Sequence, residues 1–164
     1  MVGCGLFWGH RWSISKGLLA LGCLGLGVLS PAVAVALEPT VDFIPASSLT
    51  LNGTSGNPNQ DFGVVYVQSD SATGWVLRVR SLRGGVIKHE THPATVPYSL
   101  TVNGLQVGSL AGGNAVTVMT TTGLTCAAPT GCTFPVRATM MAGDVQGKPS
   151  GSYTDTLTFT LVDQ

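Results

Sequence analysis

Charged side chains are scarce in this chain. Lys and Arg together number 8, Asp and Glu also number 8, and the formal net charge is zero when the 3 histidines are neutral. A chain without net charge has no sequence-wide electrostatic attraction to nucleic acid or to anionic lipid, so no nucleic-acid partner is expected. Gly (22), Thr, Ser and Val are abundant. This composition favours strands and turns over solvated helices.

Long apolar runs are lacking except near the N-terminus. A stretch with basic residues ends at Lys16 and is followed by the run GLLALGCLGLGVLS. Ala34 and Ala36 then supply the small residues that signal peptidase accepts, and this order is typical of an export signal. We expect residues 1–36 to be a signal peptide that is cleaved before Leu37. The mature protein would then be secreted, periplasmic or on the cell surface.

Two other interpretations of the N-terminal segment stay open. A retained membrane anchor would use the stretch from Gly17 to Ala36, which is rich in glycine, interrupted by Pro31 and barely long enough to span about 30 Å of hydrocarbon. A lipoprotein would use Cys23, but the apolar run before it is short and the better cleavage pattern lies downstream. We therefore expect no stable membrane span after cleavage.

Cysteine is equally scarce in the mature part. Cys4 and Cys23 lie in the predicted signal, which leaves only Cys126 and Cys132. An even pair in an exported protein predicts a disulfide, and the proline and glycine between the two cysteines can turn the backbone to bring the sulfurs together. Such a small ring contributes about 2 kcal/mol, so it fastens one loop and does not hold the whole fold. A redox centre needs a tighter spacing, and a zinc site needs more ligands.

The mature chain consists of short strand patterns between turn signals, without a sustained helical repeat. In WVLRVRSL, Trp75, Leu77 and Val79 share one face and two arginines lie on the other. We expect this face to be core, which makes Trp75 a packing residue; the alternative is a platform for stacking a sugar. Gly84 and Gly85 then predict a tight turn of a hairpin into the strand VIK.

Further strand patterns recur at intervals of about ten residues. Pro135 places its strand near a sheet edge. Asp155 lies near the start of the inward face of the final strand, opposite a ladder of threonines. The patterns are FGVVYVQS from Phe62, VPYSLTVNG from Val96, AVTVMT from Ala115, TFPVRATMM from Thr133 and YTDTLTFTLVDQ from Tyr153.

This arrangement predicts the fold class. About seven strands that each bury one face favour an all-β, immunoglobulin-like two-sheet antiparallel β-sandwich, because two such sheets cover each other. A closed barrel is the structural alternative. The length fits a single domain over residues 37–164.

Groups for catalysis or metal binding are few. His89, Glu90 and His92 could place two nitrogens and an oxygen around a metal, but their spacing is loose and further ligands would have to come from elsewhere. The other interpretation is an ordinary solvated loop. There is no G-x-S-x-G elbow and no glycine-rich phosphate loop that opens a helix. We expect neither an enzyme nor a cofactor.

One modification signal lies in the Gly/Asn/Ser/Pro-rich stretch 52–60, which we expect to be a loop. Asn52, Gly53 and Thr54 match a glycosylation acceptor. The match matters only in a eukaryotic secretory pathway, so it identifies no function.

The C-terminal segment GSYTDTLTFTL resembles the last strand of spore-coat-protein-U-type domains and of the related archaic chaperone–usher pilins. Their ending is commonly G-x-Y-x-D followed by alternating Thr and apolar residues, and Gly151, Tyr153 and Asp155 match that motif. The runs GWVLRVRS and VPYSL, with the glycine turn between them, look like the central part of the same family. Many such pilins carry a cysteine in the mature N-terminal segment, and this chain does not.

The resemblance implies an incomplete immunoglobulin-like fold whose groove is filled by an N-terminal extended segment from the next subunit. The candidate donor is segment 37–52. The alternative is that this segment is the first strand of its own domain, which is favoured because its two apolar pairs are out of step and Pro45 removes a backbone donor. The apolar residues of the segment are Val41, Phe43, Leu49 and Leu51.

The function implied by the resemblance is that of an exported structural or adhesive surface protein, such as a pilus or coat subunit that assembles by β-strand addition. Its partners would be like subunits or a periplasmic chaperone and usher. The alternative is a secreted, self-complete β-sandwich that binds carbohydrate or another ligand.

Overall fold

The computed structural model describes residues 38–46 and 50–164. The described residues all belong to one compact unit of the chain. The predicted signal peptide and the donor candidate Leu49 lie outside the described residues. Within the described ranges, none of the helices has the length and apolar character needed to cross a membrane.

Strands form nearly all of the regular structure, as the composition predicts. The part of the chain that the structure describes also holds two short helical segments, η1 (Ala111–Gly113) and α1 (Ala142–Val145). The strands are β1 (Thr40–Pro45), β2 (Asn57–Gln68), β3 (Trp75–Ser81), β4 (Val86–His89), β5 (Thr95–Pro97), β6 (Ser99–Val102), β7 (Leu105–Gln106), β8 (Val116–Thr120), β9 (Cys132–Met140), β10 (Tyr153–Thr154) and β11 (Leu157–Asp163). The stretch 52–60 is therefore a loop only up to the start of β2.

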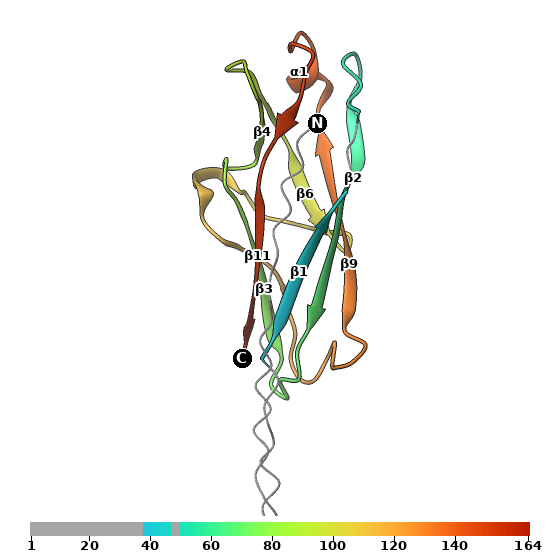
Figure 1. Cartoon of the computed structure of the whole chain (residues 1–164), viewed down its shortest axis with the longest axis vertical. Coiled ribbons are helices and arrows are strands. Elements are labelled where there is room, and N and C mark those ends of the chain that lie inside the picture. Colours follow the sequence, from blue (N-terminus) through green and yellow to red (C-terminus); the bar gives the residue numbers. More distant parts are fainter. Residues whose placement is uncertain (1–37, 47–49) are drawn as a thin grey trace, which may run out of the picture. The chain divides into compact units, whose positions relative to one another are not determined.

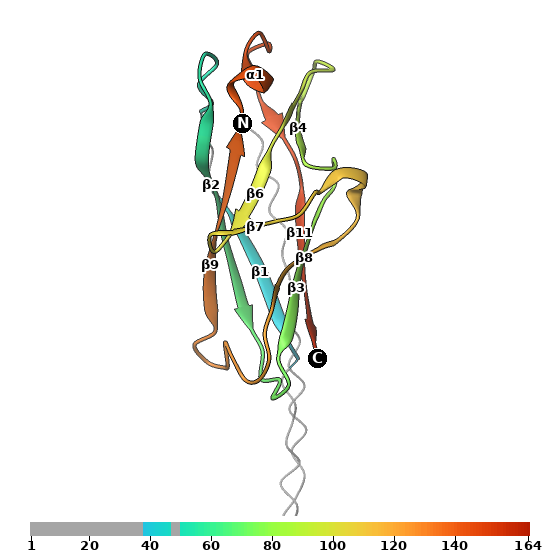
Figure 2. The same cartoon turned by 180° about the vertical axis from the view of Figure 1, so that it is seen from behind.

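The strands pack in two antiparallel layers. One layer is a five-stranded sheet in the order β1-β2-β9-β6-β7. The other layer consists of two three-stranded sheets, β10-β4-β5 and β11-β3-β8. These two sheets lie end to end, because β10 continues into β11 after only Asp155 and Thr156. In both views β2 and β9 run along one side of the molecule and β3 and β11 along the other (Figures 1 and 2). The predicted two-sheet antiparallel sandwich is confirmed.

The core lies between the layers and is filled from both by alternate residues. Trp75 is 1% exposed, and Leu77 and Val79 beside it are fully buried. Across the core, β2 and β9 contribute Val65 and Val136, which are also fully buried. The core interpretation of Trp75 is confirmed, and a stacking platform on this ring is excluded because the ring does not reach the surface.

The prediction that Gly84 and Gly85 close a hairpin is wrong. β3 pairs with β11 and β8, whereas β4 pairs with β10 and β5, so the two strands do not pair with each other. The glycines have φ angles of 70° and 79°, and the Gly85 N–H donates to Ser81 Oγ at 2.7 Å. Because both edges of β3 are occupied, the turn continues the chain along the same layer.

The predicted strand from Val96 is divided between the two layers. β5 pairs with β4 and β6 pairs with β9. Tyr98 lies between β5 and β6, and its N–H donates to the carbonyl of Gly85 at 3.0 Å. Pro97 has no N–H to continue a ladder, so the chain can change layers at this point.

The prediction that Pro135 lies near a sheet edge is also wrong. β9 lies between β2 and β6, and Pro135 pairs with Val64 of β2. The carbonyl of Pro135 accepts a hydrogen bond of 2.8 Å from Asn103 N, beyond the last β6 pair at Val102. The nitrogen and carbonyl of a strand residue point to the same side of the strand. The nitrogen of Pro135, which carries no hydrogen, therefore faces β6 at a point where the β6–β9 ladder has already ended.

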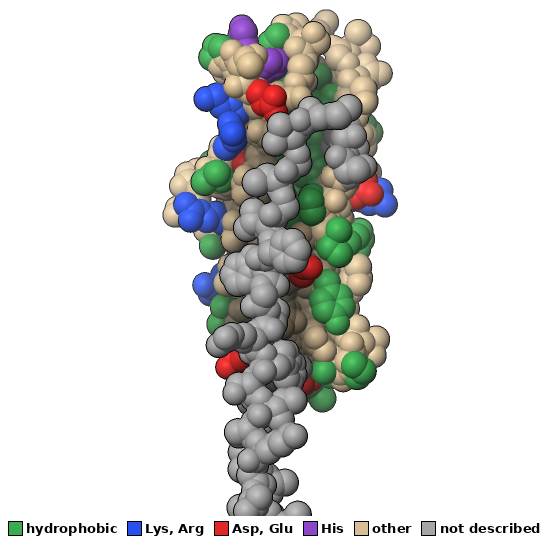
Figure 3. Space-filling view, viewed as in Figure 1, with side chains coloured by type: hydrophobic (Ala, Val, Ile, Leu, Met, Phe, Trp, Pro, Cys, Tyr) green, Lys and Arg blue, Asp and Glu red, His purple; other side chains and the backbone are tan. Residues whose placement is uncertain are grey.

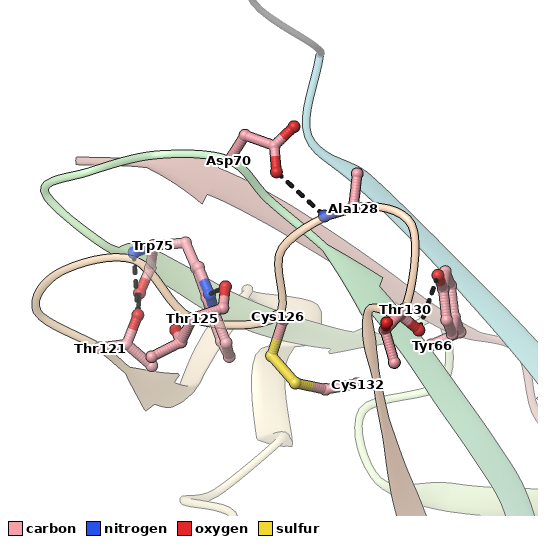
Figure 4. The surroundings of a disulfide bond; sticks show 9 residues. All are labelled: Tyr66, Asp70, Trp75, Thr121, Thr125, Cys126, Ala128, Thr130 and Cys132. Atoms are coloured by element: carbon pink, nitrogen blue, oxygen red, sulfur yellow. Dashed lines mark hydrogen bonds between the residues drawn. A yellow bond between two sulfur atoms is a disulfide. The ribbon is translucent and has the colours of Figure 1, made fainter.

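The disulfide predicted from the cysteine pair is present. Cys126 and Cys132 are joined with an S–S distance of 2.00 Å (Figure 4). The loop that they close lies at the end of the sandwich that also holds the C-terminus (Figure 1). The loop is tied to β2 and to the residues after it by three hydrogen bonds, which are Ser69 N to Cys126 O (3.1 Å), Ala128 N to Asp70 Oδ1 (3.0 Å) and Tyr66 Oη to Thr130 O (3.3 Å).

Candidate functional site

An apolar cleft opens between the two layers on the side where β1 and β11 face each other. Its volume is about 830 Å³. One wall comes from β1, β2 and the segment between them, and the other from β4, β10 and β11. The principal apolar residues of the walls are Phe43, Leu51, Phe62, Ile87, Tyr153 and Leu157.

The strands beside the cleft are both sheet edges. Among the described residues, β1 pairs only with β2, from Thr40 opposite Gln68 to Pro45 opposite Gly63, and β11 pairs only with β3. The two edges nevertheless touch through their side chains, because the ring centroids of Phe43 and Phe159 are 5.1 Å apart. Edge backbone beside an apolar groove is the combination that an added strand can use.

Gly63 permits β1 to lie against β2. Its φ angle is +128°, in a region that L side chains rarely adopt, and a Cβ at this position would overlap the backbone of Ile44 and Pro45. The β2–β9 register shifts between Asp61 and Gly63, and the Gly63 N–H donates to Asp61 Oδ1 at 3.0 Å. The cleft wall therefore depends on a glycine at a bulge, which the strand pattern from Phe62 did not single out.

The structure places the donor candidates as follows. Val41 and Phe43 are half-buried and pack against the core. The residue that follows each of them, Asp42 and Ile44, is exposed. Leu51 also packs against the core, but it lies in the link before β2. In this structure β1 thus pairs with β2 of the same chain.

Two residues of the C-terminal motif pack around His89. Gly151 has a φ angle of +146°, and a Cβ there would overlap the His89 ring. The Tyr153 ring meets the same imidazole edge-on, with centroids 4.9 Å apart, and its hydroxyl donates to Pro149 O at 2.8 Å. The glycine of the motif is therefore required sterically.

His89 is itself engaged through both ring nitrogens. It is 8% exposed, its Nδ1 accepts the N–H of Thr91 at 3.2 Å, and its Nε2 lies 3.0 Å from Ser150 O. An accepting Nδ1 places the proton on Nε2, which then donates to the carbonyl. The His92 ring centroid lies 6.0 Å away, and Glu90 is exposed. Within residues 38–46 and 50–164, no group of three or more His, Cys, Asp or Glu side chains is placed to hold a metal.

Asp155, the last motif residue, points inward as its phase predicts and joins three parts of the fold. Its Oδ2 accepts from Ser81 Oγ and from the Tyr98 hydroxyl, both at 2.6 Å, and its Oδ1 accepts from Arg83 N at 3.1 Å and Thr156 N at 2.7 Å. Burial, together with the hydrogen bond to Asp155, raises the pKa of Tyr98 well above its ordinary value. This cluster holds β3, the β5–β6 crossover and the start of β11 together.

Sequence reasoning did not find the partners of Asp155. Ser81 and Tyr98 come from segments 74 and 57 residues away. The one available signal was the inward phase of Asp155, because a carboxylate that turns away from solvent requires hydrogen-bond donors. The glycosylation acceptor lies apart from this cluster, with Asn52 Oδ1 accepting from the N–H and hydroxyl of Thr54, both at 2.9 Å.

No protein-family model matches the chain, and no curated protein matches it. The class of the protein is therefore defined by its fold, an all-β, immunoglobulin-like antiparallel sandwich with a disulfide between Cys126 and Cys132. Its candidate functional site is the apolar cleft between two edge strands.

Proposed function

We propose that the protein is an exported structural or adhesive surface subunit, of the spore-coat-protein-U or archaic pilin type, which assembles by β-strand addition at the cleft. The observation that carries this proposal is the pair of edge strands, β1 and β11, which face each other beside an apolar cleft of about 830 Å³. Like subunits are the assembly partners, and a periplasmic chaperone and usher would protect the cleft before assembly.

The strand that exchanges is β1. Cleavage before Leu37 would leave only three residues ahead of β1, so no separate N-terminal extension is available as a donor. β1 has one ladder partner and contributes two half-buried apolar side chains, so its release disturbs less of the core than the release of a central strand. In trans it would make the same contacts with the next copy, and repetition of this exchange gives an open chain of subunits.

A pair of opposed cysteines tests this exchange. Thr40 and Gln68 are direct partners in the β1–β2 register, where Cβ atoms lie about 5 Å apart. The mature chain with Thr40→Cys and Gln68→Cys is unfolded, refolded slowly at high concentration, oxidised and separated without reductant. Exchange predicts a ladder of covalent multimers. Covalent monomers alone would show that β1 stays in its own domain and would refute the proposal.

Two controls make the result specific. Thr40→Cys alone shows how much dimer arises from random oxidation. Light scattering on the unmodified mature chain, before and after the same refolding, shows whether multimers form without added cysteines.

A peptide of residues 37–52 added during refolding should compete for the cleft and shorten the ladder.

A polar rim supports the second candidate function, a secreted sandwich that binds carbohydrate. Glu90 and Lys148 line the same cleft as Tyr153, which combines polar groups with an aromatic ring. A glycan array with the mature chain tests it. Binding that is lost in Glu90→Gln and Lys148→Met variants of unchanged stability would favour this function, whereas an array without any signal would exclude it.

A further inference from the structure

The basic side chains that follow residue 37 are concentrated in one short segment. Six Lys and Arg residues follow position 37, against eight Asp and Glu residues, so this part of the chain carries a net negative charge. Four of the six cations lie between residues 78 and 88, and all four are exposed: Arg78, Arg80, Arg83 and Lys88. The neutral total charge therefore conceals a local excess of positive charge.

Strand alternation brings these cations to one face. β3 buries the alternate residues from Trp75 to Ser81, so Arg78 and Arg80 point outward, and β4 buries Ile87 and His89, so Lys88 also points outward. Both strands belong to the layer formed by β10 and β11. In Figure 3, Lys and Arg side chains follow the long side of the molecule on which Figure 1 draws β3 and β11.

Threonines of the neighbouring strands complete this surface, which we call the basic face. Each outward cation of the strands lies opposite an exposed threonine, as Arg78 with Thr160, Arg80 with Thr158 and Lys88 with Thr154. Arg78 and Arg80 are two strand residues apart, or about 7 Å. Thr158 lies opposite Arg80 and Thr154 lies opposite Lys88, and the four residues from Thr158 to Thr154 add about 13 Å. The basic face is thus a row of about 20 Å in which each cation of the strands has a hydroxyl beside it on the neighbouring strand.

Within the strands no acidic side chain neutralises the row, and the exposed Glu90 lies just beyond β4, two residues after Lys88, at one end of it. The outward positions of β3, β4, β10 and β11 hold no Asp or Glu. Asp155 turns inward to Ser81, and Asp163, at the far end of β11, accepts a hydrogen bond of 2.7 Å from Ser69 Oγ. Arg80 donates through Nε to Gly113 O at 2.7 Å, which orients its guanidinium and leaves both terminal nitrogens to face a ligand.

We infer that the basic face binds a linear anionic polysaccharide with carboxylate or sulfate groups. Guanidinium groups bind such oxyanions with paired hydrogen bonds, and threonine hydroxyls can exchange hydrogen bonds with sugar hydroxyls. The outward positions of these strands carry no aromatic ring on which unpaired bases could stack. A membrane surface would instead require a continuous apolar face between the cations, whereas threonines lie beside Arg78 and Arg80 and the outward valines, Val76 and Val162, pair at one end of the row.

This binding does not depend on strand exchange. The basic side chains point away from the core, whereas the cleft opens between the layers, so the basic face is available in a monomer and in an assembly alike. In an assembly the face would be repeated on every subunit, which would raise the avidity for a long polymer.

The test is equilibrium binding of the mature protein to heparin, polygalacturonate and neutral dextran, at salt concentrations from about 50 mM to about 500 mM. We expect binding to the two anionic polymers but not to dextran, with an affinity that falls as salt rises. Arg78→Ser combined with Arg80→Ser should weaken binding about tenfold or more. Arg137→Ser, which removes an exposed arginine of the opposite layer, is the matched control and should leave the affinity within about twofold.

Lys88→Ser and Arg83→Ser, each alone, provide a second measure should the double variant prove unstable. Each should weaken binding severalfold while the circular dichroism spectrum stays unchanged. The inference is overturned by an absence of binding at low salt, by an equal loss in Arg137→Ser, or by full binding in the double variant. Tighter binding to duplex DNA or to vesicles containing phosphatidylserine would also overturn it.

Discussion

The hydroxyl of Tyr98 donates a hydrogen bond of 2.6 Å to Oδ2 of Asp155. Tyr98 lies where the chain crosses from one layer to the other, and Asp155 lies at the junction of β10 and β11, beside the cleft. One side chain of the C-terminal motif thus controls how the final strand meets the strand that links the two layers.

Tyr98→Phe should destabilise the fold. The variant removes one of two donors to Oδ2 of a half-buried carboxylate, and hydrogen bonds to charged groups contribute about 1.5–3 kcal/mol. Urea unfolding at neutral pH measures the loss. Tyr66→Phe is the control, because the Tyr66 hydroxyl makes a longer hydrogen bond of 3.3 Å to a neutral carbonyl of an exposed loop. An equal effect of both substitutions would contradict the role of the Asp155 bond.

The same pair predicts the behaviour of the protein at alkaline pH. Burial and the bond to Asp155 raise the pKa of Tyr98 in the folded state, so the neutral phenol stabilises the fold at pH values below the unfolded pKa of about 10. This contribution decreases as pH rises above that value. The free energy of unfolding, measured from pH 8 to about 11, should decrease more steeply in the wild type than in Tyr98→Phe. Parallel curves would exclude Tyr98 as the responsible group.

Gly151→Ala should cost about 2–4 kcal/mol, because the position combines a φ angle of +146° with overlap of the new Cβ and the His89 ring. Thermal and urea unfolding measure the effect. Gly143→Ala, at a position where a Cβ meets open space, serves as the control and should change stability by less than about 1 kcal/mol. A stable Gly151→Ala variant would show that the glycine of the motif is not a steric requirement.

Replacement of Cys126 and Cys132 by serine should lower the free energy of unfolding by about 2 kcal/mol, the value for a small ring. Cys126 packs only at the margin of the core, so the protein should still fold, and the unfolding transition should remain cooperative. Reduction of the wild type with dithiothreitol should give the same loss. A chain that no longer folds without the bond would mean that the disulfide does more than fasten one loop.

Phe43→Ala should lower stability by about 1–3 kcal/mol, because it removes a half-buried ring that contacts Phe159. It should also reduce the multimers formed on refolding, since the donor strand loses its main apolar side chain. Ile44→Ala changes an exposed residue of the same strand and should have little effect on either measurement. Equal effects at both positions would argue against the inward orientation of Phe43.

Much of the fold could be predicted because the relevant signal is local. The alternation in WVLRVRSL and YTDTLTFTL identified the buried face of β3 and of β11, including the inward position of Asp155. A spacing of six residues with a turn between was sufficient to predict the bond between Cys126 and Cys132. A period of two residues shows which face of a strand is buried, whatever its neighbours are.

The choice of neighbours was decided only by the tertiary structure. Gly84 and Gly85 have the residue types of a hairpin turn, but β3 was already paired on both edges. Pro135 lies in a central strand because its nitrogen faces the end of β6. The hydrogen bond from Tyr98 to Asp155 and the row of cations from Arg78 to Lys88 likewise depend on which strands lie side by side. Strand pairing joins residues far apart in the chain, and no local pattern in the sequence records it.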